Sequence, residues 1–220
     1  MRRHARGRCG AEKYYEEESF MDFTKVKAAL TARGYAVQCF EAAAEAAAYL
    51  NAQIDGTSVS FGGSMTVEAM GLYDSLGAHN EVVSHWHARA GESADALRRR
   101  AMGTAVYVCS ANAVAETGEL VNIDGSGNRL ASTLYGHERV YYVVGRNKLA
   151  PTLDAAVRRA REVAAPKNAA RLGAKTPCAA TGVCADCRSE VRICRALLIL
   201  WDAVRSCRSE VVLIDEELGY

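Results

Sequence analysis

The sequence lacks a strong excess of either charge, because 27 Lys and Arg residues stand against 26 Asp and Glu residues, for a formal net charge of +1. Broad binding to nucleic-acid phosphates normally needs a clear basic excess, so we expect no nucleic-acid partner. The chain also lacks an apolar run of the ~20 residues that a membrane-spanning helix needs. Residues 1–20 are basic and then acidic, without the apolar segment of a secretory signal. We therefore expect no membrane association and a cytoplasmic location.

Two nucleotide-binding fingerprints are absent as well. The chain has no G-x-G-x-x-G run, and no glycine loop is followed by Gly-Lys-Ser or Gly-Lys-Thr. An autonomous nicotinamide dehydrogenase and a P-loop enzyme are therefore both disfavoured. What the chain does have is a 50% hydrophobic composition over 220 residues. This is enough for one domain with a sizeable core and a small appendage.

Strand and helix patterns alternate along the chain. Short apolar, β-branched segments predict strands at 35–40, 57–61, 81–84, 105–110 and 139–145. Segments of helical character predict helices at 21–34, 41–54, 64–71, 92–102 and 151–164, with a further short helix after Pro166. This order predicts an α/β fold with a mainly parallel sheet and helices on both faces.

The same patterns predict how the chain is divided. We expect residues 1–20 to be a disordered leader and residues 21–175 to form the α/β core, with Asp22 capping the first helix. Residues 176–220 would then form a cysteine loop and a terminal β-hairpin, packed on the same domain. The two hairpin strands are predicted at 195–202 and 209–215.

Four of the eight cysteines gather in the segment TPCAATGVCADCRSEVRIC, at Cys178, Cys184, Cys187 and Cys194. In a reducing compartment such thiols bind metal or stay free. Four thiolates suit a structural zinc site or an iron–sulfur cluster, and the spacing does not choose between them. Three arginines among the cysteines can offset the negative charge. The alternative is a set of reduced or redox-active thiols, including a Cys184–Cys187 disulfide.

The segment SFGGSMT, residues 60–66, carries the clearest small-molecule signal. Gly62 and Gly63 follow a predicted strand and let a backbone approach a ligand, while Ser64 and Thr66 open a helix. Exposed N–H groups at such a position favour a phosphate or carboxylate. The alternative is that Ser64 caps the helix and the glycines only form a turn.

A second candidate site runs from Cys109 to Arg129. Asn112 follows a predicted central strand, and open α/β sheets bind ligands beyond the carboxyl ends of their strands. Glu116 is the candidate nucleophile or base, and Arg129 the candidate partner of a carboxylate. The alternative is that the run N-I-D-G-S-G-N simply forms a turn.

Three further residues carry weaker signals. Lys148 follows a strand end and is a candidate anion contact, with a solvated lysine as the alternative. His85 and His87 would share one face of a strand. Without a third ligand beside them, we interpret the two histidines as partly exposed loop residues rather than as metal ligands.

Four segments together resemble the lactate-utilization (LUD) domain family, and in particular its short stand-alone members with a C-terminal cysteine loop. The segments are SFGGSMTVEAMGL, SANAVAETGELVNIDGSGNR, VVGRNKLAPTLDAAVRRAREVAAPKNAARL and TPCAATGVCADCRSEVRIC. The resemblance runs from Met21 to Tyr220, and Cys207 has no place in the family's cysteine pattern. It implies a fold similar to the glucosamine-6-phosphate isomerase, ribose-5-phosphate isomerase and CoA-transferase group. In that group a Gly-Gly-Ser/Thr loop holds an anion, and Gly62, Gly63, Ser64 and Thr66 correspond to it.

The resemblance also implies a role in the oxidation of lactate to pyruvate, beside iron–sulfur and oxidoreductase protein partners. Our first hypothesis is a redox-linked, metal-containing accessory component that binds a small anionic ligand. One alternative is an isomerase- or CoA-transferase-like enzyme that uses Glu116 on an acyl or sugar-phosphate substrate. Another is a non-catalytic ligand-binding regulator. The edges of an α/β sheet are compatible with a homodimer, although no residue specifies one.

Overall fold

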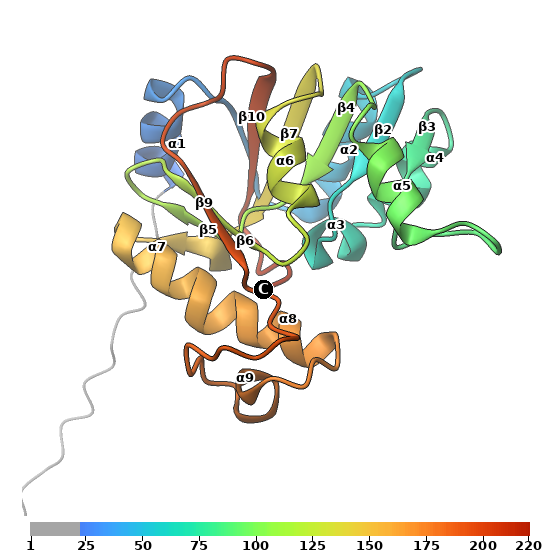
Figure 1. The fold of residues 1–220 in the computed structure, drawn as a ribbon. Coiled ribbons are helices and arrows are strands. Elements are labelled where there is room, and N and C mark those ends of the chain that lie inside the picture. Colours follow the sequence, from blue (N-terminus) through green and yellow to red (C-terminus); the bar gives the residue numbers. More distant parts are fainter. Residues whose placement is uncertain (1–22) are drawn as a thin grey trace, which may run out of the picture.

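The computed structural model describes residues 23–220, so the predicted leader and the predicted cap Asp22 lie outside the described residues. Helices and strands alternate through this range (Figure 1). None of the described helices combines the length and the apolar character needed to cross a membrane. The elements are α1 (Phe23–Ala32), β1 (Ala36–Phe40), α2 (Ala43–Gln53), β2 (Ser58–Phe61), α3 (Met65–Ala69), α4 (Leu72–Gly77), β3 (Glu81–Val83), α5 (Ala94–Ala101), β4 (Val106–Cys109), β5 (Ala113–Ala115), β6 (Leu120–Asp124), α6 (Asn128–Leu134), β7 (Arg139–Gly145), the 3-10 turn η1 (Arg146–Lys148), β8 (Leu149–Ala150), α7 (Leu153–Arg159), the π-helical segment η2 (Ala160–Ala164), α8 (Ala165–Arg171), α9 (Pro177–Thr181), β9 (Ala196–Leu200) and β10 (Arg208–Ile214).

A six-stranded sheet forms the centre of the molecule. Its strand order is β1-β10-β7-β4-β2-β3, and the pairings are parallel throughout. The central strands β4, β7 and β10 are buried over nearly their whole length. Continuous burial is typical of parallel strands covered on both faces, which explains their apolar, β-branched sequences. The predicted α/β fold with a mainly parallel sheet is therefore confirmed.

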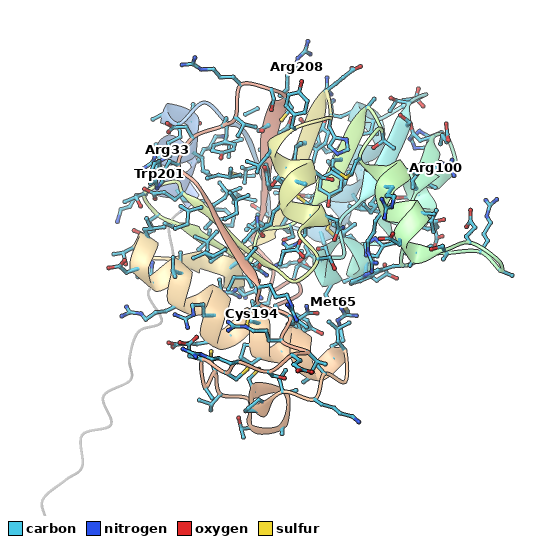
Figure 2. The ribbon with its side chains drawn as sticks, viewed as in Figure 1. Arg33, Met65, Arg100, Cys194, Trp201 and Arg208 are labelled. Carbon is cyan, nitrogen blue, oxygen red and sulfur yellow. The ribbon has the colours of Figure 1, made fainter. Side chains whose placement is uncertain are left out.

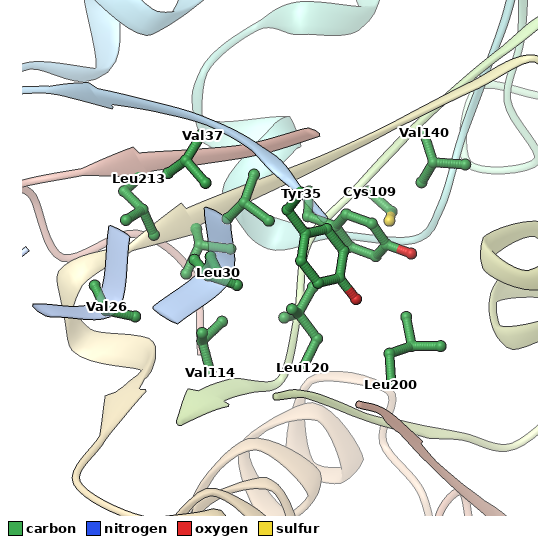
Figure 3. Close-up of a cluster of buried hydrophobic side chains, with 14 of the residues drawn as sticks. Val26, Leu30, Tyr35, Val37, Cys109, Val114, Leu120, Val140, Leu200 and Leu213 are labelled. Carbon is green, nitrogen blue, oxygen red and sulfur yellow. The ribbon is translucent and has the colours of Figure 1, made fainter. Parts of the chain in front are cut away.

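Each face of this sheet has its own hydrophobic core. On one face, side chains such as Tyr142 and Leu213 pack against Val26 and Leu30 of α1 and against a second, smaller sheet (Figure 3). On the other face, α2, α3 and α4 contribute the buried side chains Leu50, Val67 and Leu72. Successive side chains of each strand point to opposite faces of the sheet, so neighbouring residues contribute to different cores.

The predicted terminal β-hairpin is wrong. β9 pairs antiparallel with β6 at the edge of the small sheet, whose order is β8-β5-β6-β9. β10 instead lies between β1 and β7 in the large sheet and is parallel to both. The burial of each strand explains the difference. β10 is buried on both faces, whereas β9 is exposed at its first two residues and suits a sheet edge.

The predicted helix break at Pro166 does not occur either. α7, η2 and α8 continue as one long helix across the outer face of the small sheet (Figure 1). The π-helical turn η2 comes directly before α8, and Pro166 lies in the first turn of α8. The missing backbone N–H of proline destabilises a helix least at this position. The small side chains of Ala156 and Ala160 are fully buried and let this helix pack closely on the sheet.

Candidate functional site

A pocket of about 230 Å³ lies beyond the carboxyl ends of three strands of the large sheet. Its walls include Gly63 and Ser64 after β2, Ser110 and Asn112 after β4, and Lys148 after β7. This is where ligands bind in open α/β sheets. Because pockets for drug-sized ligands usually measure about 300–1,000 Å³, this one suits a smaller molecule.

The Gly62–Gly63 pair is required by close packing. A Cβ atom at Gly63 would lie 2.8 Å from the Trp86 ring, and one at Gly62 would lie 2.7 Å from Tyr107 Oη. Gly63 lines the pocket, whereas Gly62 is not part of its lining. Ser64 caps α3 by accepting a hydrogen bond from a backbone N–H at 3.3 Å. The predicted cap is therefore present, and the loop also forms one wall of the pocket.

Arg129 is held rigidly in the opposite wall. Its guanidinium donates to Asn122 Oδ1 at 2.6 Å, to Asn112 Oδ1 at 3.1 Å and to the carbonyl oxygen of Ile123. The Asp124 carboxylate lies 3.9 Å from Arg129 Nε and accepts three backbone N–H groups of the loop that follows it. The structure thus brings the predicted residues Asn112 and Arg129 into direct contact, with the arginine only 13% exposed.

Lys148 lies at the base of the pocket and is 3% exposed. Its Nζ donates to Thr66 Oγ1 at 2.6 Å and to Ser110 Oγ at 2.7 Å. Within residues 23–220 no carboxylate forms an ion pair with it. Burial lowers the pKa of Lys148 to about 7, and the nearby charges of Arg159 and Arg129 add to the effect. The solvated-lysine alternative is therefore wrong.

Sequence reasoning assigned no role to Trp86 and interpreted His85 only as a partly exposed loop residue. His85 lines the pocket, and burial, with the nearby charge of Arg98, lowers its pKa below the usual 6.5. Trp86 lines it too, with the guanidinium of Arg171 stacked 4.7 Å from the ring centroid. The S-H-W-H run follows the predicted strand 81–84, so the strand-end rule could have found His85. His87 points elsewhere, because its ring stacks on Tyr73.

The pocket has a pronounced charge imbalance. Its lining includes four cationic side chains and one acidic side chain, Asp124. The cationic residues are Arg98, Arg129, Lys148 and Arg171. Charges that share a partly buried concave surface interact more strongly than they would in water, so this lining attracts anions.

A family model described as the LUD domain matches residues 23–214. The chain belongs to the LUD domain family. At the family level the LUD domain is associated with lactate utilization. Among solved structures, the chain is similar to a DUF162 family protein from Deinococcus radiodurans, with a TM-score of 0.52 and 13% identity over 87% of this chain and 95% of that chain. That likeness concerns the fold. None of the curated proteins compared with the chain matches it.

In this LUD domain, Glu116 does not line the pocket. It directly follows β5, and its backbone N–H donates to the carbonyl oxygen of Ala150 at 2.8 Å. The more buried carboxylate nearby is Glu119, which forms an ion pair with Arg33 at 2.5 Å. The arrangement therefore gives Glu116 no contact with a ligand in the pocket.

The cysteine segment lies within the range that matches the LUD domain. All four predicted ligands are half-buried, and each is a free thiol, so the Cys184–Cys187 disulfide is not formed. Cys184 and Cys194 line a second depression of about 320 Å³. Arg192 donates to the carbonyl oxygens of Cys187 at 2.7 Å and Cys194 at 3.1 Å, and it lies 3.4 Å from Cys194 Sγ. Arg192 thus connects Cys187 to Cys194 through hydrogen bonds to both residues.

The donor chemistry of the segment fits a zinc or iron–sulfur site, because thiolates are the usual ligands of both. Between Cys184 and Cys187, Asp186 has a φ of 44°, which gives the C-x-x-C stretch a tight turn. However, no group of three or more His, Cys, Asp or Glu side chains within residues 23–220 is arranged to hold a metal ion. The metal site therefore stays a prediction.

Proposed function

We propose that this LUD domain binds a small carboxylate of the lactate and pyruvate class in the pocket that Arg129 and Lys148 line. The observation that carries the proposal is the lining itself, with four cationic side chains and one acidic side chain around about 230 Å³. The association of the family with lactate utilization supports this class of ligand.

The individual side chains suit a carboxylate in different ways. Arg129 is fixed by hydrogen bonds from its two Nη groups to Asn122, Asn112 and two backbone carbonyl oxygens, so its Nε–H group and its charge are what it offers an anion. The Oδ1 atom of Asn112 is occupied, but no hydrogen bond within residues 23–220 engages its Nδ2 group, which is free to donate. Arg171 adds a charge at the exposed rim, beside Trp86.

Titration calorimetry with L-lactate and with pyruvate tests this proposal. We expect both anions to bind, and Arg129→Gln to weaken binding by about tenfold, since a charge-assisted hydrogen bond contributes about 1.4 kcal/mol or more. Arg171→Gln, at the exposed rim, should weaken binding less. The matched control is Arg99→Gln, because Arg99 is exposed and lies outside the pocket lining. Absence of binding by the wild-type protein would overturn the proposal.

We further propose that Cys178, Cys184, Cys187 and Cys194 hold zinc or an iron–sulfur cluster, and that the protein acts as a redox-linked accessory component beside oxidoreductase proteins. The thiol chemistry, the tight turn at Asp186 and the cationic Arg192 support this proposal. An iron–sulfur cluster would supply electron transfer, whereas zinc would only stabilise the segment.

Metal and sulfide analysis, with an absorption spectrum of protein purified without oxygen, tests the metal proposal. We expect a stoichiometric metal that is lost in Cys184→Ser and Cys187→Ser. Cys207→Ser is the matched control, since Cys207 is equally half-buried but packs against the main core. Protein without zinc, iron or sulfide would contradict this part of the account and leave the pocket proposal intact.

A further inference from the structure

We propose that Lys148 is a catalytic nucleophile that forms an imine with the carbonyl carbon of a small 2-oxo acid bound in the pocket. This inference rests on the proposed function, because it requires that the pocket hold a small carboxylate. It goes further by assigning covalent chemistry to one side chain and by separating two classes of ligand. A 2-hydroxy acid such as lactate can only bind, whereas a 2-oxo acid such as pyruvate can also react.

The first argument is the position of Lys148. Lys148 is buried, yet it is one of the residues that line the pocket, so it adjoins the space that a bound ligand would occupy. A lysine that only stabilised the fold would normally pair with a carboxylate when it is buried to this extent. The atoms that contact Nζ are instead two neutral hydroxyl oxygens, at 2.6 and 2.7 Å.

The second argument is the direction of those hydrogen bonds. Thr66 Oγ1 donates its only proton to the carbonyl oxygen of Leu218 at 3.0 Å, so towards Lys148 it must accept. The Ser110 hydroxyl has a longer alternative acceptor, the carbonyl oxygen of Ala111 at 3.3 Å. Its proton can therefore turn towards a neutral Lys148 amine at 2.7 Å. The Thr66 hydroxyl therefore orients the amine, and the Ser110 hydroxyl can exchange a proton with it.

The third argument is that the uncharged amine is accessible at neutral pH. Only the neutral amine has a lone pair for attack, and an ordinary lysine is almost fully protonated at neutral pH. Burial lowers the pKa of Lys148 to about 7, helped by the Arg159 and Arg129 guanidinium groups. Of these two groups Arg129 also lines the pocket, so one cationic group of the proposed binding site favours the reactive form of the lysine.

The chemical step balances without any further reactant. The Nζ lone pair attacks the carbonyl carbon, and one of the two amine protons passes to the carbonyl oxygen to give a carbinolamine. Nitrogen then loses its remaining proton while the oxygen leaves as water, and a C=N bond replaces C=O. Ser110 is the residue placed to relay these protons, since its hydroxyl is the one with a free orientation.

Reductive trapping tests the proposal. The full-length protein is incubated with pyruvate and sodium cyanoborohydride, and the modified residue is located by peptide mass spectrometry. We expect one adduct, on Lys148, that excess L-lactate suppresses and that Lys148→Met removes. Lys167→Met is the matched control, because Lys167 is exposed on α8 and its loss should leave labelling unchanged. Ser110→Ala should slow labelling by about a hundredfold.

Locating the labelled residue in the wild-type protein tests the inference even if a variant fails to fold. Labelling spread over exposed lysines, with Lys148 unmodified, would overturn the inference. If calorimetry shows that pyruvate binds but Lys148 is never trapped, the imine is wrong and the proposed function stands. If neither pyruvate nor lactate binds and nothing is trapped, both proposals fail.

Discussion

The surroundings of Lys148, rather than its residue type, decide its chemistry. From the sequence it was a candidate anion contact next to a strand end. In the structure its side chain is largely buried, and its amine contacts two hydroxyl groups, with two guanidinium groups nearby and no carboxylate paired with it. Such an environment destabilises the ammonium form until an anion binds and restores the balance of charge. Binding of lactate, which cannot react with the amine, should therefore be coupled to uptake of a proton by Lys148, whereas imine formation with a 2-oxo acid draws on the neutral amine.

This coupling predicts a pH dependence of lactate binding. Because the pKa of free Lys148 is about 7 and a bound carboxylate raises it, affinity should fall by about tenfold between about pH 6 and about pH 8. Arg159 and the Cys109 thiol keep one charge state in this window. The pKa of Arg159 is about 10, that of the Cys109 thiol is about 12, and that of His85 lies below 6.5. Calorimetry across this pH range should show the fall in lactate affinity, and Lys148→Met should abolish the pH dependence.

Gly63 offers a prediction about packing in the pocket wall. Gly63→Ala would place a Cβ 2.8 Å from the Trp86 ring, so the ring must shift. Overpacking of this kind costs about 1–3 kcal/mol. Gly103→Ala is the matched control, since a Cβ there would meet only a carbonyl oxygen at 3.8 Å. Urea denaturation should show a clear loss of stability for the first variant alone, and equal stabilities would show that the wall is looser than the structure indicates.

Among the secondary-structure elements, the strands of the large sheet were predicted, whereas of the small sheet only β9 was. The predicted strand 139–145 coincides with β7, and 105–110 contains β4. β5 and β8 have three and two residues, too few for any periodic pattern to emerge. The apolar pattern of β9 and β10 identified both as strands but did not specify their partners. Pairing depends on burial in the completed fold, which a local pattern does not contain.

The end of α1 and the small sheet are joined by one side chain, Arg33. Its guanidinium donates to the carbonyl oxygens of Thr117 and Trp201, both at 2.6 Å, and forms an ion pair with Glu119 (Figure 2). Arg33→Ala removes the ion-pair partner of the buried Glu119 carboxylate and the donor to two carbonyl oxygens, so we expect a loss of about 2 kcal/mol.

The control for this substitution is Arg99→Ala, which removes an exposed ion pair with Asp95 along α5. Exposed pairs of this kind contribute about 0.5 kcal/mol or less. Urea denaturation of both variants should therefore separate them clearly. Equal losses would mean that Arg33 does not join α1 to the small sheet in solution.

For the molecule as a whole, the sequence located part of the pocket lining. Gly63, Asn112 and Lys148 were predicted because each follows a strand, and parallel strands end at the same edge. Arg98 is one of three adjacent arginines in α5, and Arg171 is an exposed residue at the end of α8, so only the packing of the two helices around the pocket identifies them. Tertiary structure therefore supplies part of the positive charge on which the proposed function depends.

The fold also brings the cysteine segment against the pocket wall. The backbone N–H of Arg195 donates to the carbonyl oxygen of Asp124 at 2.9 Å, and Ile193, next to Cys194, lines the pocket. A Cβ at Gly125 would lie 2.8 Å from the carbonyl oxygen of Ile193, so the two segments are in close contact. Residues far apart in the sequence thus place the thiols and the cationic pocket side by side.

The central claim is that this cationic pocket binds a small carboxylate. A crystal structure of the protein soaked with L-lactate tests it most directly. The account predicts difference density in the pocket, with the carboxylate of lactate in contact with Arg129 or Lys148 and beside the Nδ2 group of Asn112. Density for lactate at another site, or ordered water alone in the pocket at a saturating lactate concentration, would contradict it.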